Sequence, residues 1–278
     1  MGAERIERRF AENRERDRCG GLLPYFTAGF PDSAAFGEFI RAADGLGVIA
    51  VEVGMPYSDS IADGPIIQGS FNEALSRGHN VEATFDAVAG VRASVDCGLL
   101  AMVSYSIVRR IGVDAFVDRA AATGFDGLIV PDLPLEESAP LAHAARRAEL
   151  CHVGLVAPTT CPERRRTISR QSTGFIYRIA VAGTTGERDS LPAGLEADVA
   201  QLRNDSSLPV CVGFGVSTVE QVRAVCAFAD GAVVGSAVIR RIDDELKKGS
   251  ARRMVIASVA RLLRELMSGT GGGSGGDA

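Results

Sequence analysis

The chain has 278 residues, of which 46% are hydrophobic and 23% are charged, as is ordinary for a soluble globular protein with a sizeable core. A net charge of −5 and a pI near 5.4 argue against a surface that binds nucleic acid or an anionic membrane. No apolar run approaches the roughly 18 residues of a membrane-spanning helix, and the charged N-terminus lacks the apolar core of a signal peptide.

The first 16 residues predict an amphipathic helix that precedes the main fold. Eight short apolar runs follow, each ending in Gly, Pro or a small polar residue, which is a pattern typical of buried strands. These runs begin at Leu22, Gly47, Gly98, Gly127, Cys151, Gly174, Pro209 and Gly231.

Segments of helical period lie between these strands, at residues 33–46, 81–94, 113–123, 136–148, 195–203 and 218–228, with a weaker one at 162–171. Strands that alternate with helices indicate right-handed βαβ units and a parallel sheet. Eight units in this length close into a single (βα)8 TIM barrel, an α/β fold. The alternative, an open doubly wound sheet, needs a Gly-rich phosphate turn after its first strand, and FTAGFPD contains only one Gly.

We therefore predict one barrel domain over residues 1–268 and a flexible Gly/Ser-rich tail over residues 269–278. The six cysteines are scattered without any CxxC pair, so a disulfide framework is not expected. This cysteine usage favours a cytoplasmic protein.

Glu52 interrupts the second predicted strand, GVIAVEVG, which is otherwise apolar. Side chains alternate faces along a strand, which places Glu52 inside the barrel near its C-terminal mouth. A carboxylate there resists ionisation, so we expect a raised pKa suited to proton transfer. The alternative is a structural Glu paired with Arg178, unless Tyr177 points inward and turns Arg178 outward. Alternation predicts an inward set of Ala50, Glu52 and Gly54, and an outward set of Ile49, Val51 and Val53.

Two aspartates follow the same strand on a loop punctuated by Gly and Pro. For Asp63, in ADGP, the alternative to a catalytic role is a simple turn residue. Its place just after the mouth end of a barrel strand, where catalytic groups concentrate, favours catalysis. For Asp59, in YSDS, a loop-capping role is the better interpretation.

Glycine turns follow the last three predicted strands, and the last of them opens a helix. Backbone N–H groups at such turns and at a helix N-terminus bind phosphate, and barrels place this site after strands seven and eight. Three turns on consecutive strand ends favour a phosphorylated substrate. The turns contain Gly183 and Gly186, Gly213 and Gly215, and Gly235 with Ser236.

The lysines and histidines limit the reaction mechanisms that this chain can use. The two lysines, Lys247 and Lys248, are adjacent and far from any strand end, which argues against a Schiff-base mechanism. The three histidines lack metal-ligand spacing, and no dinucleotide fingerprint or P-loop is present. We predict proton chemistry carried by carboxylates, with Tyr177 as a further candidate and with no cofactor and no metal.

Six motifs occur in an order that resembles one enzyme family. They are LLPYFTAGFPD, VEVGMPYSDSIADGPIIQG, GLIVPDLPLEE, YRIAVAGTTGER, VGFGVST and VVGSAV, and together they span nearly the whole predicted barrel. On these motifs the chain resembles the α subunit of tryptophan synthase, and the acidic motif after the second strand is the most specific of them. That family cleaves indole-3-glycerol phosphate into indole and glyceraldehyde 3-phosphate, a retro-aldol step with neither cofactor nor metal.

The resemblance implies a role for each matching residue. Glu52 matches the residue that exchanges protons at indole C3 and the glycerol hydroxyl. Asp63 matches the carboxylate that holds the indole N–H and stabilises the indolenine cation. The implied phosphate-binding residues are Gly186, Gly215, Gly235 and Ser236, and the predicted substrate-binding residues are Tyr25, Tyr177, Thr185 and Phe214.

The resemblance also implies a partner, a pyridoxal-phosphate β subunit that receives the indole, with an α2β2 heterotetramer as the expected assembly. Ser60, Ser106 and Ile107 depart from the family pattern on loops that in the family face this β subunit. Two other functions remain open: a stand-alone lyase that releases free indole, and a catalytically silent activating subunit. The joint presence of Glu52, Asp63 and Tyr177 counts against the silent subunit.

Overall fold

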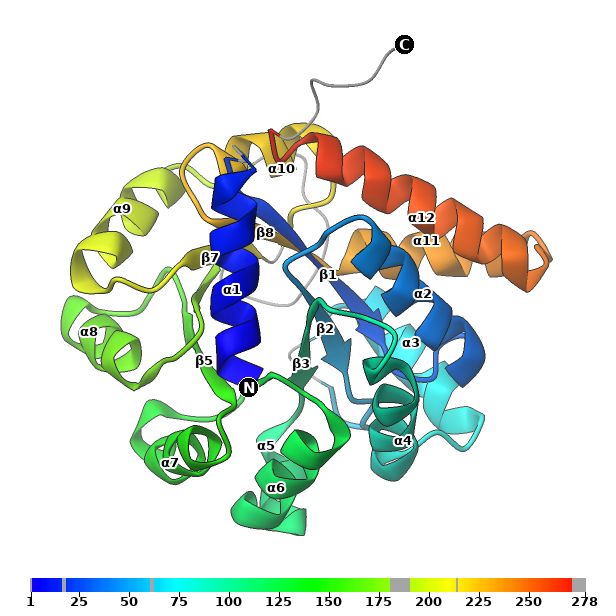
Figure 1. Cartoon of the computed structure of the whole chain (residues 1–278), viewed down its shortest axis with the longest axis horizontal. Helices are drawn as coiled ribbons and strands as arrows, with labels where there is room; N and C mark the ends of the chain where they lie inside the picture. The colour runs from blue at the N-terminus through cyan, green and yellow to red at the C-terminus, as the bar shows by residue number, and fades with distance from the viewer. Residues whose placement is uncertain (1, 17–18, 61–62, 181–190, 214, 272–278) are drawn as a thin grey trace.

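The predicted barrel is confirmed. The computed structural model describes residues 2–16, 19–60, 63–180, 191–213 and 215–271, and its eight parallel strands form a closed barrel in chain order (Figure 1). The strands are β1 Gly21–Thr27, β2 Ala50–Gly54, β3 Gly98–Met102, β4 Gly127–Ile129, β5 Cys151–Val156, β6 Ile176–Ile179, β7 Val210–Gly213 and β8 Gly231–Val234.

Helices surround the barrel, and three of them, α3, α5 and α12, were not among the helical segments predicted from the sequence. The helix α3 begins with a proline directly behind Gly64, so its start looks like a continuation of the preceding turn. The helices are α1 Gly2–Glu15, α2 Ser33–Gly45, α3 Pro65–Ser76, α4 Val81–Arg92, α5 Tyr105–Ile111, α6 Val113–Thr123, α7 Ala139–Arg147, α8 Pro162–Gln171, α9 Leu195–Asp205, α10 Val219–Cys226, α11 Ser236–Lys247 and α12 Arg252–Ser268, with the short 3-10 helix η1 at Leu135–Glu137.

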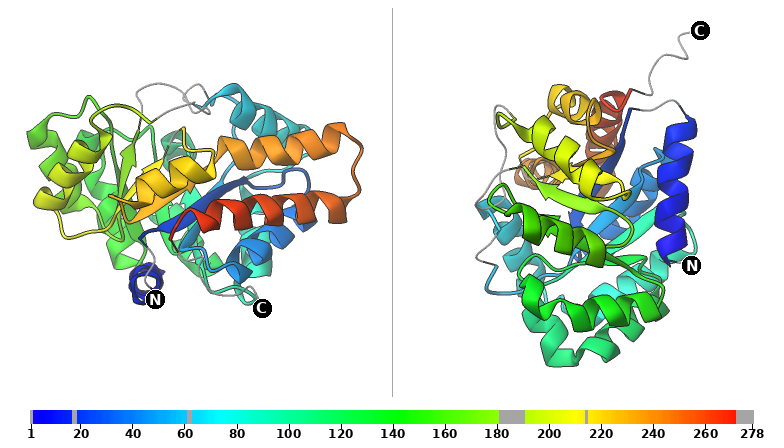
Figure 2. Two further views of the ribbon diagram at one scale, coloured as in Figure 1. Left: turned by 90° about the horizontal axis from the view of Figure 1, so that it is seen from above. Right: turned by 90° about the vertical axis from the view of Figure 1, so that its left-hand side faces the viewer.

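The helix α1 lies across one end of the barrel, as Figures 1 and 2 show. Its buried residues Ile6 and Phe10 join the cluster inside the barrel, where the Phe10 ring lies 5.9 Å from that of Phe175. The first residue of α1 lies against the segments that lead into β4 and β5, so this is the end at which the strands begin. The opposite end, at the carboxyl ends of the strands, is left for a functional site.

One predicted orientation is wrong. Ile49 was expected to face the outer helices, but it belongs to the cluster inside the barrel. The strand β2 begins only at Ala50, so the alternation of faces does not extend back to Ile49. Ala50 lies in the inner cluster, while Val51 and Val53 belong to the outer core, as expected.

The predicted tail begins too early. Thr270 is fully buried, and its carbonyl accepts a hydrogen bond from the Cys19 backbone N–H at 3.0 Å. Gly269 also lies close to Val222 of α10, so packing of the chain continues at least to Thr270. The rest of the expected tail, residues 272–278, lies outside the described part of the chain. Within the described residues, no helix is long and apolar enough to cross a membrane.

A buried ion-pair network ties α1 to the barrel. Asp126, which is 1% exposed, accepts hydrogen bonds from Arg5 at 2.5 Å and from Arg92 at 3.0 Å. Its second oxygen also accepts from the Leu99 backbone N–H at 2.8 Å. The network therefore links α1, α4, β3 and the segment before β4 through one carboxylate.

Replacing Asp126 by asparagine is expected to destabilise the fold by about 3 kcal/mol, because the change leaves two arginines without their buried counter-charge. Asp96→Asn provides the control, since Asp96 is 55% exposed and its pair with Arg8 is a surface pair worth about 1 kcal/mol or less. Urea unfolding of both variants measures the difference. Equal losses in the two variants would contradict this role for Asp126.

Candidate active site

Glu52 is held inside the barrel at the middle of β2, and its side chain is 1% exposed. Its neighbours in the sheet register are Tyr25 on β1 and Leu100 on β3. Its Oε1 atom is buried without a hydrogen-bond partner among the described residues. Burial raises the pKa of Glu52 well above its ordinary value and so favours the protonated form that a general acid requires.

The alternative partner for Glu52 faces away from it. Tyr177 is part of the cluster inside the barrel, so alternation turns Arg178 outward. The Arg178 guanidinium there forms an ion pair with Asp198 of α9 and donates to the Ile179 carbonyl. The interpretation of Glu52 as half of a structural ion pair with Arg178 is therefore wrong.

Tyr25 and Tyr177 flank the same carboxyl, and glycines on neighbouring strands make room for their hydroxyls. A Cβ atom at Gly54 would lie 1.9 Å from the Tyr25 hydroxyl oxygen, and one at Gly213 would lie 2.4 Å from that of Tyr177. Both tyrosines are buried, and burial raises the pKa of each well above its usual value. The charge of Glu52 adds to both shifts, which places the two rings close to it.

Asp63 lies on the loop that leads from β2 into α3, and its backbone N–H donates to the Ser60 carbonyl at 3.0 Å. Burial, followed by the charge of Asp132, raises the pKa of Asp63 to about 6. The charge of Asp63 also raises the pKa values of Tyr25 and Tyr177, so all three belong to one site. A carboxyl with a pKa near 6 is mostly ionised at neutral pH.

The two carboxyls therefore lie in different environments. Burial alone raises the pKa of Glu52 and favours its protonated form, while Asp63, with a pKa of about 6, is mostly ionised at neutral pH. Different environments of this kind allow two carboxyls in one site to act as acid and as anionic stabiliser. The pair can give a proton to one atom of a substrate and stabilise positive charge at another.

The late glycine turns are partly described. Gly215, just after β7, has a φ of +105°, a conformation that L side chains rarely adopt. Gly235 is the N-cap of α11, and Ser236 is the first residue of that 12-residue helix. The free backbone N–H groups and the helix dipole there favour an anion. Of the other predicted residues, Thr185, Gly186 and Phe214 lie outside the described part of the chain, as does Gly183.

Sequence reasoning missed the apolar rim and one charged residue of this site. Met102, Leu155 and Ile179 are the inward residues nearest the strand ends, and they pack on the inner cluster while staying partly exposed. They offer an apolar wall for an aromatic ring. Asp132, whose charge acts on Asp63, follows β4 and accepts from the Tyr105 backbone N–H at 2.8 Å. Each of these four residues lies at or just after the carboxyl end of a strand, and that position in the sequence could have identified it as a site residue.

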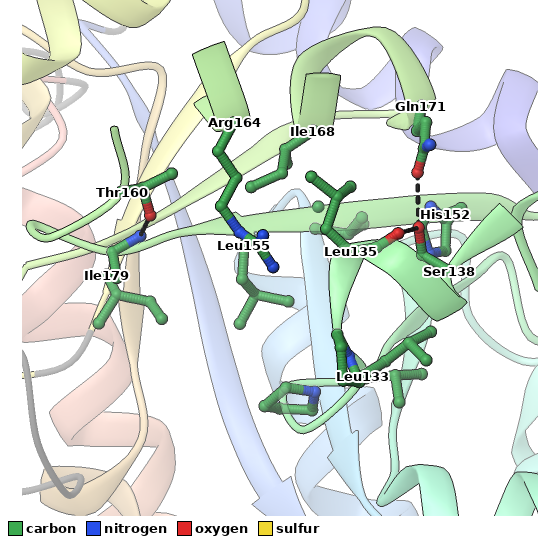
Figure 3. A pocket seen from close by; sticks show the side chains of 16 residues that line it. Leu133, Leu135, Ser138, His152, Leu155, Thr160, Arg164, Ile168, Gln171 and Ile179 are labelled. Atoms are coloured by element: carbon green, nitrogen blue, oxygen red, sulfur yellow. Dashed lines mark hydrogen bonds between the residues drawn. The ribbon is translucent and has the colours of Figure 1, made fainter. Parts of the chain in front are cut away.

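Cavities lie beside the site. A cavity of about 850 Å³ lies over the loops after β2 and β3, lined among others by Tyr57, Asp59, Ser106 and Asp132. A smaller one of about 200 Å³ lies between β5, α8 and η1 (Figure 3), where the Ser138 hydroxyl donates to the Gln171 side chain at 2.6 Å. Leu155 and Ile179 of the apolar rim also line this smaller cavity, so it adjoins the site on the side of β5 and β6.

Comparison with known proteins agrees with this geometry. The family described as "Tryptophan synthase alpha chain" matches residues 10–267. The chain belongs to the tryptophan synthase alpha chain family. The tryptophan synthase alpha chain of Gloeobacter violaceus is 41% identical over 237 residues, which cover 85% of this chain and 86% of that relative. That of Carboxydothermus hydrogenoformans is 37% identical over 264 residues, covering 95% and 98%.

The fold of this chain is also similar to those of solved tryptophan synthase structures. A chain of Mycobacterium tuberculosis tryptophan synthase has a TM-score of 0.85 at 32% identity, covering 95% of this chain and 97% of that one. Tryptophan synthase subunit alpha from Legionella pneumophila has a TM-score of 0.87 at 28% identity, covering 96% and 98%. Membership of the tryptophan synthase alpha family confirms the predicted class of enzyme, a lyase of tryptophan biosynthesis, and this family works with a β subunit.

Proposed function

We propose that Glu52 and Asp63 carry out the cleavage of indole-3-glycerol phosphate into indole and glyceraldehyde 3-phosphate in this chain. The observation that supports this assignment is a pair of carboxyls in one site, Glu52, whose protonated form burial favours, and Asp63, which is mostly ionised at neutral pH. Tyr25 and Tyr177 enclose the pair, and the apolar rim provides a surface for the indole ring.

The reaction balances with these two groups alone. Glu52 gives its proton to indole C3, which leaves a cationic indolenine, and the Asp63 carboxylate accepts the ring N–H and stabilises that charge. The ionised Glu52 then takes the proton of the glycerol hydroxyl next to the ring. As the carbonyl of glyceraldehyde 3-phosphate forms, the bond to C3 breaks and its electron pair returns to the ring, which leaves neutral indole.

Indole release from indole-3-glycerol phosphate by the purified chain tests the proposal. The account predicts turnover above the uncatalysed background, and kcat/KM should rise with pH as Asp63 ionises near pH 6. No turnover with or without a β subunit would favour the silent activating subunit instead.

The phosphate is assigned to the turns at Gly215, Gly235 and Ser236, at the N-terminus of α11. Ser236→Asp is therefore expected to raise KM at least about tenfold, because it places a negative charge beside the substrate phosphate. A carboxylate at a helix N-terminus does not weaken the helix, so folding should be preserved. Ser236→Ala, which removes only the hydroxyl, should change KM far less. An unchanged KM in Ser236→Asp would place the phosphate elsewhere.

For the partner, we propose an α2β2 heterotetramer in which a β subunit covers the mouth and receives the indole. The large cavity over the loops after β2 and β3 and the exposed Ser106 support this face as the contact. Of the residues that depart from the family pattern, Ser60 and Ile107 are buried, so Ser106 is the one that meets a partner directly. We also propose that the protein acts in the cytoplasm, in keeping with its six free cysteines.

Adding a cognate β subunit is expected to increase indole release, because a partner that binds the catalytically active conformation of this face more tightly than other conformations shifts the population toward it. Indole release titrated with β subunit, together with the mass of the complex in solution, measures this effect. Fast turnover by the chain alone that the β subunit leaves unchanged would identify a stand-alone lyase.

A further inference from the structure

Gln68, in the first turn of α3, holds both sides of the loop that carries Asp63. Its side-chain Nε2 donates to the Ser60 carbonyl at 2.9 Å and to the Asp63 carbonyl at 2.8 Å. Both N–H bonds of the amide are used in this way, so the side chain is fully committed as a donor. The place of Asp63 is thereby fixed relative to α3.

The same helix is anchored to the barrel two residues further on. The Ser70 hydroxyl lies 2.6 Å from that of Thr27 at the end of β1, and these side chains are 2% and 1% exposed. Ser70 also donates to the Ile67 carbonyl at 2.7 Å, and the Tyr25 hydroxyl lies 3.3 Å from that of Thr27. Each hydroxyl has one proton, so donation runs from Tyr25 to Thr27, then to Ser70, and ends at Ile67.

Together these contacts connect both sides of the catalytic pair. Tyr25 is the sheet neighbour of Glu52, and Thr27 follows it on the same face of β1. From Thr27 the connection passes through Ser70 and α3 to Gln68, and so to Asp63. The Thr27–Ser70 and Ser70–Ile67 bonds are buried and short, at 2.6 and 2.7 Å, so losing one leaves a buried polar group unpaired, which is costly.

We infer that Thr27, Gln68 and Ser70 form a positioning chain that sets the place of Asp63 relative to Glu52. The three residues act through Asp63 and Tyr25, while the chemistry stays with the carboxyls. A displacement of about 1 Å in a catalytic group can lower the rate by up to about 100-fold. The expected effect of these residues on the catalytic rate rests on the proposed function. Their effect on the position of Asp63 can be measured in the free protein, without substrate.

The test uses three substitutions, each with a matched control. Gln68→Met keeps the length of the side chain but removes both donors, and Asn72→Met alters an exposed amide on the same helix. Ser70→Ala removes the anchor, while Ser76→Ala removes an exposed hydroxyl that also bonds the carbonyl three residues back, at 2.8 Å.

Thr27→Val is isosteric but lacks the hydroxyl, and Thr27→Ser restores it. We expect kcat to fall roughly 10- to 100-fold in Gln68→Met, Ser70→Ala and Thr27→Val, with a smaller change in KM. The two control variants and Thr27→Ser should keep at least about half of the wild-type kcat. The melting temperature of every variant is measured alongside.

Carbon-13 NMR of Asp63 in the free protein provides the second readout. Its pKa, raised to about 6 in the intact site, should fall toward the ordinary value in Gln68→Met, because a released carboxyl gains water. An unchanged Asp63 pKa, an unchanged kcat, or equal losses in the controls would overturn the inference. An inactive wild type in which Gln68→Met still shifts the Asp63 pKa would refute the proposed function but keep the positioning chain.

Discussion

Glu52→Gln is expected to lower kcat for indole release by about 10²- to 10⁴-fold while leaving substrate binding nearly unchanged. The amide has the shape of the carboxyl but cannot give a proton to indole C3 or take one from the glycerol hydroxyl. Single-turnover kinetics and equilibrium binding of substrate separate the two effects. Glu196→Gln, an exposed position on α9, is the matched control and should retain full activity.

The expected fall in kcat of Glu52→Gln would not be explained by a loss of folding. A carboxyl with a folded-state pKa above its unfolded value contributes stability at low pH, and that contribution is lost as the pH rises through the folded pKa. Glutamine is neutral at every pH, so Glu52→Gln should melt no lower than the wild type at pH 8. A variant that kept more than about a tenth of the wild-type kcat would show that Glu52 is not the main acid–base group.

Asp63→Asn is expected to lower kcat by about 10²- to 10³-fold, because a neutral amide cannot stabilise the indolenine cation. The wild-type rate should rise with pH through about 6, as the folded-state carboxyl ionises, and the variant should lack that step. Measuring kcat from pH 5 to pH 8 tests both statements. Asp59→Asn, on the same loop but exposed, is the control. If Asp63→Asn matched this control, Asp63 would be a turn residue only.

Much of the barrel could be predicted because its signals are local. Each strand is a short apolar run that ends in a turn residue, and alternation within β2 correctly placed Glu52 inside the barrel. The orientation of Tyr177 on β6 was left open by the sequence, and the structure turns it inward. The same rule was wrong for Ile49, which lies before β2 begins. The helix α3 was missed because its Pro and Gly neighbours resemble a loop.

The arrangement around the carboxyls could not be predicted from the same signals. The contact between Thr27 and Ser70 joins residues 43 positions apart, and it depends on how α3 packs against β1. The donation from Gln68 to two backbone carbonyls requires a helix start that the sequence did not reveal. The effect of Asp132 on the Asp63 pKa likewise arises from the closure of the barrel, which brings separate loops together.

The most direct test of the central claim is the stoichiometry of the two products in a single turnover. Purified chain in molar excess over indole-3-glycerol phosphate, in buffer with a metal chelator, is sampled for indole and for glyceraldehyde 3-phosphate. Carboxyl-based proton transfer predicts equal amounts of both products at a rate the chelator leaves unchanged, and almost none with Glu52→Gln. Full product formation by Glu52→Gln, or a rate that the chelator abolishes, would contradict the account.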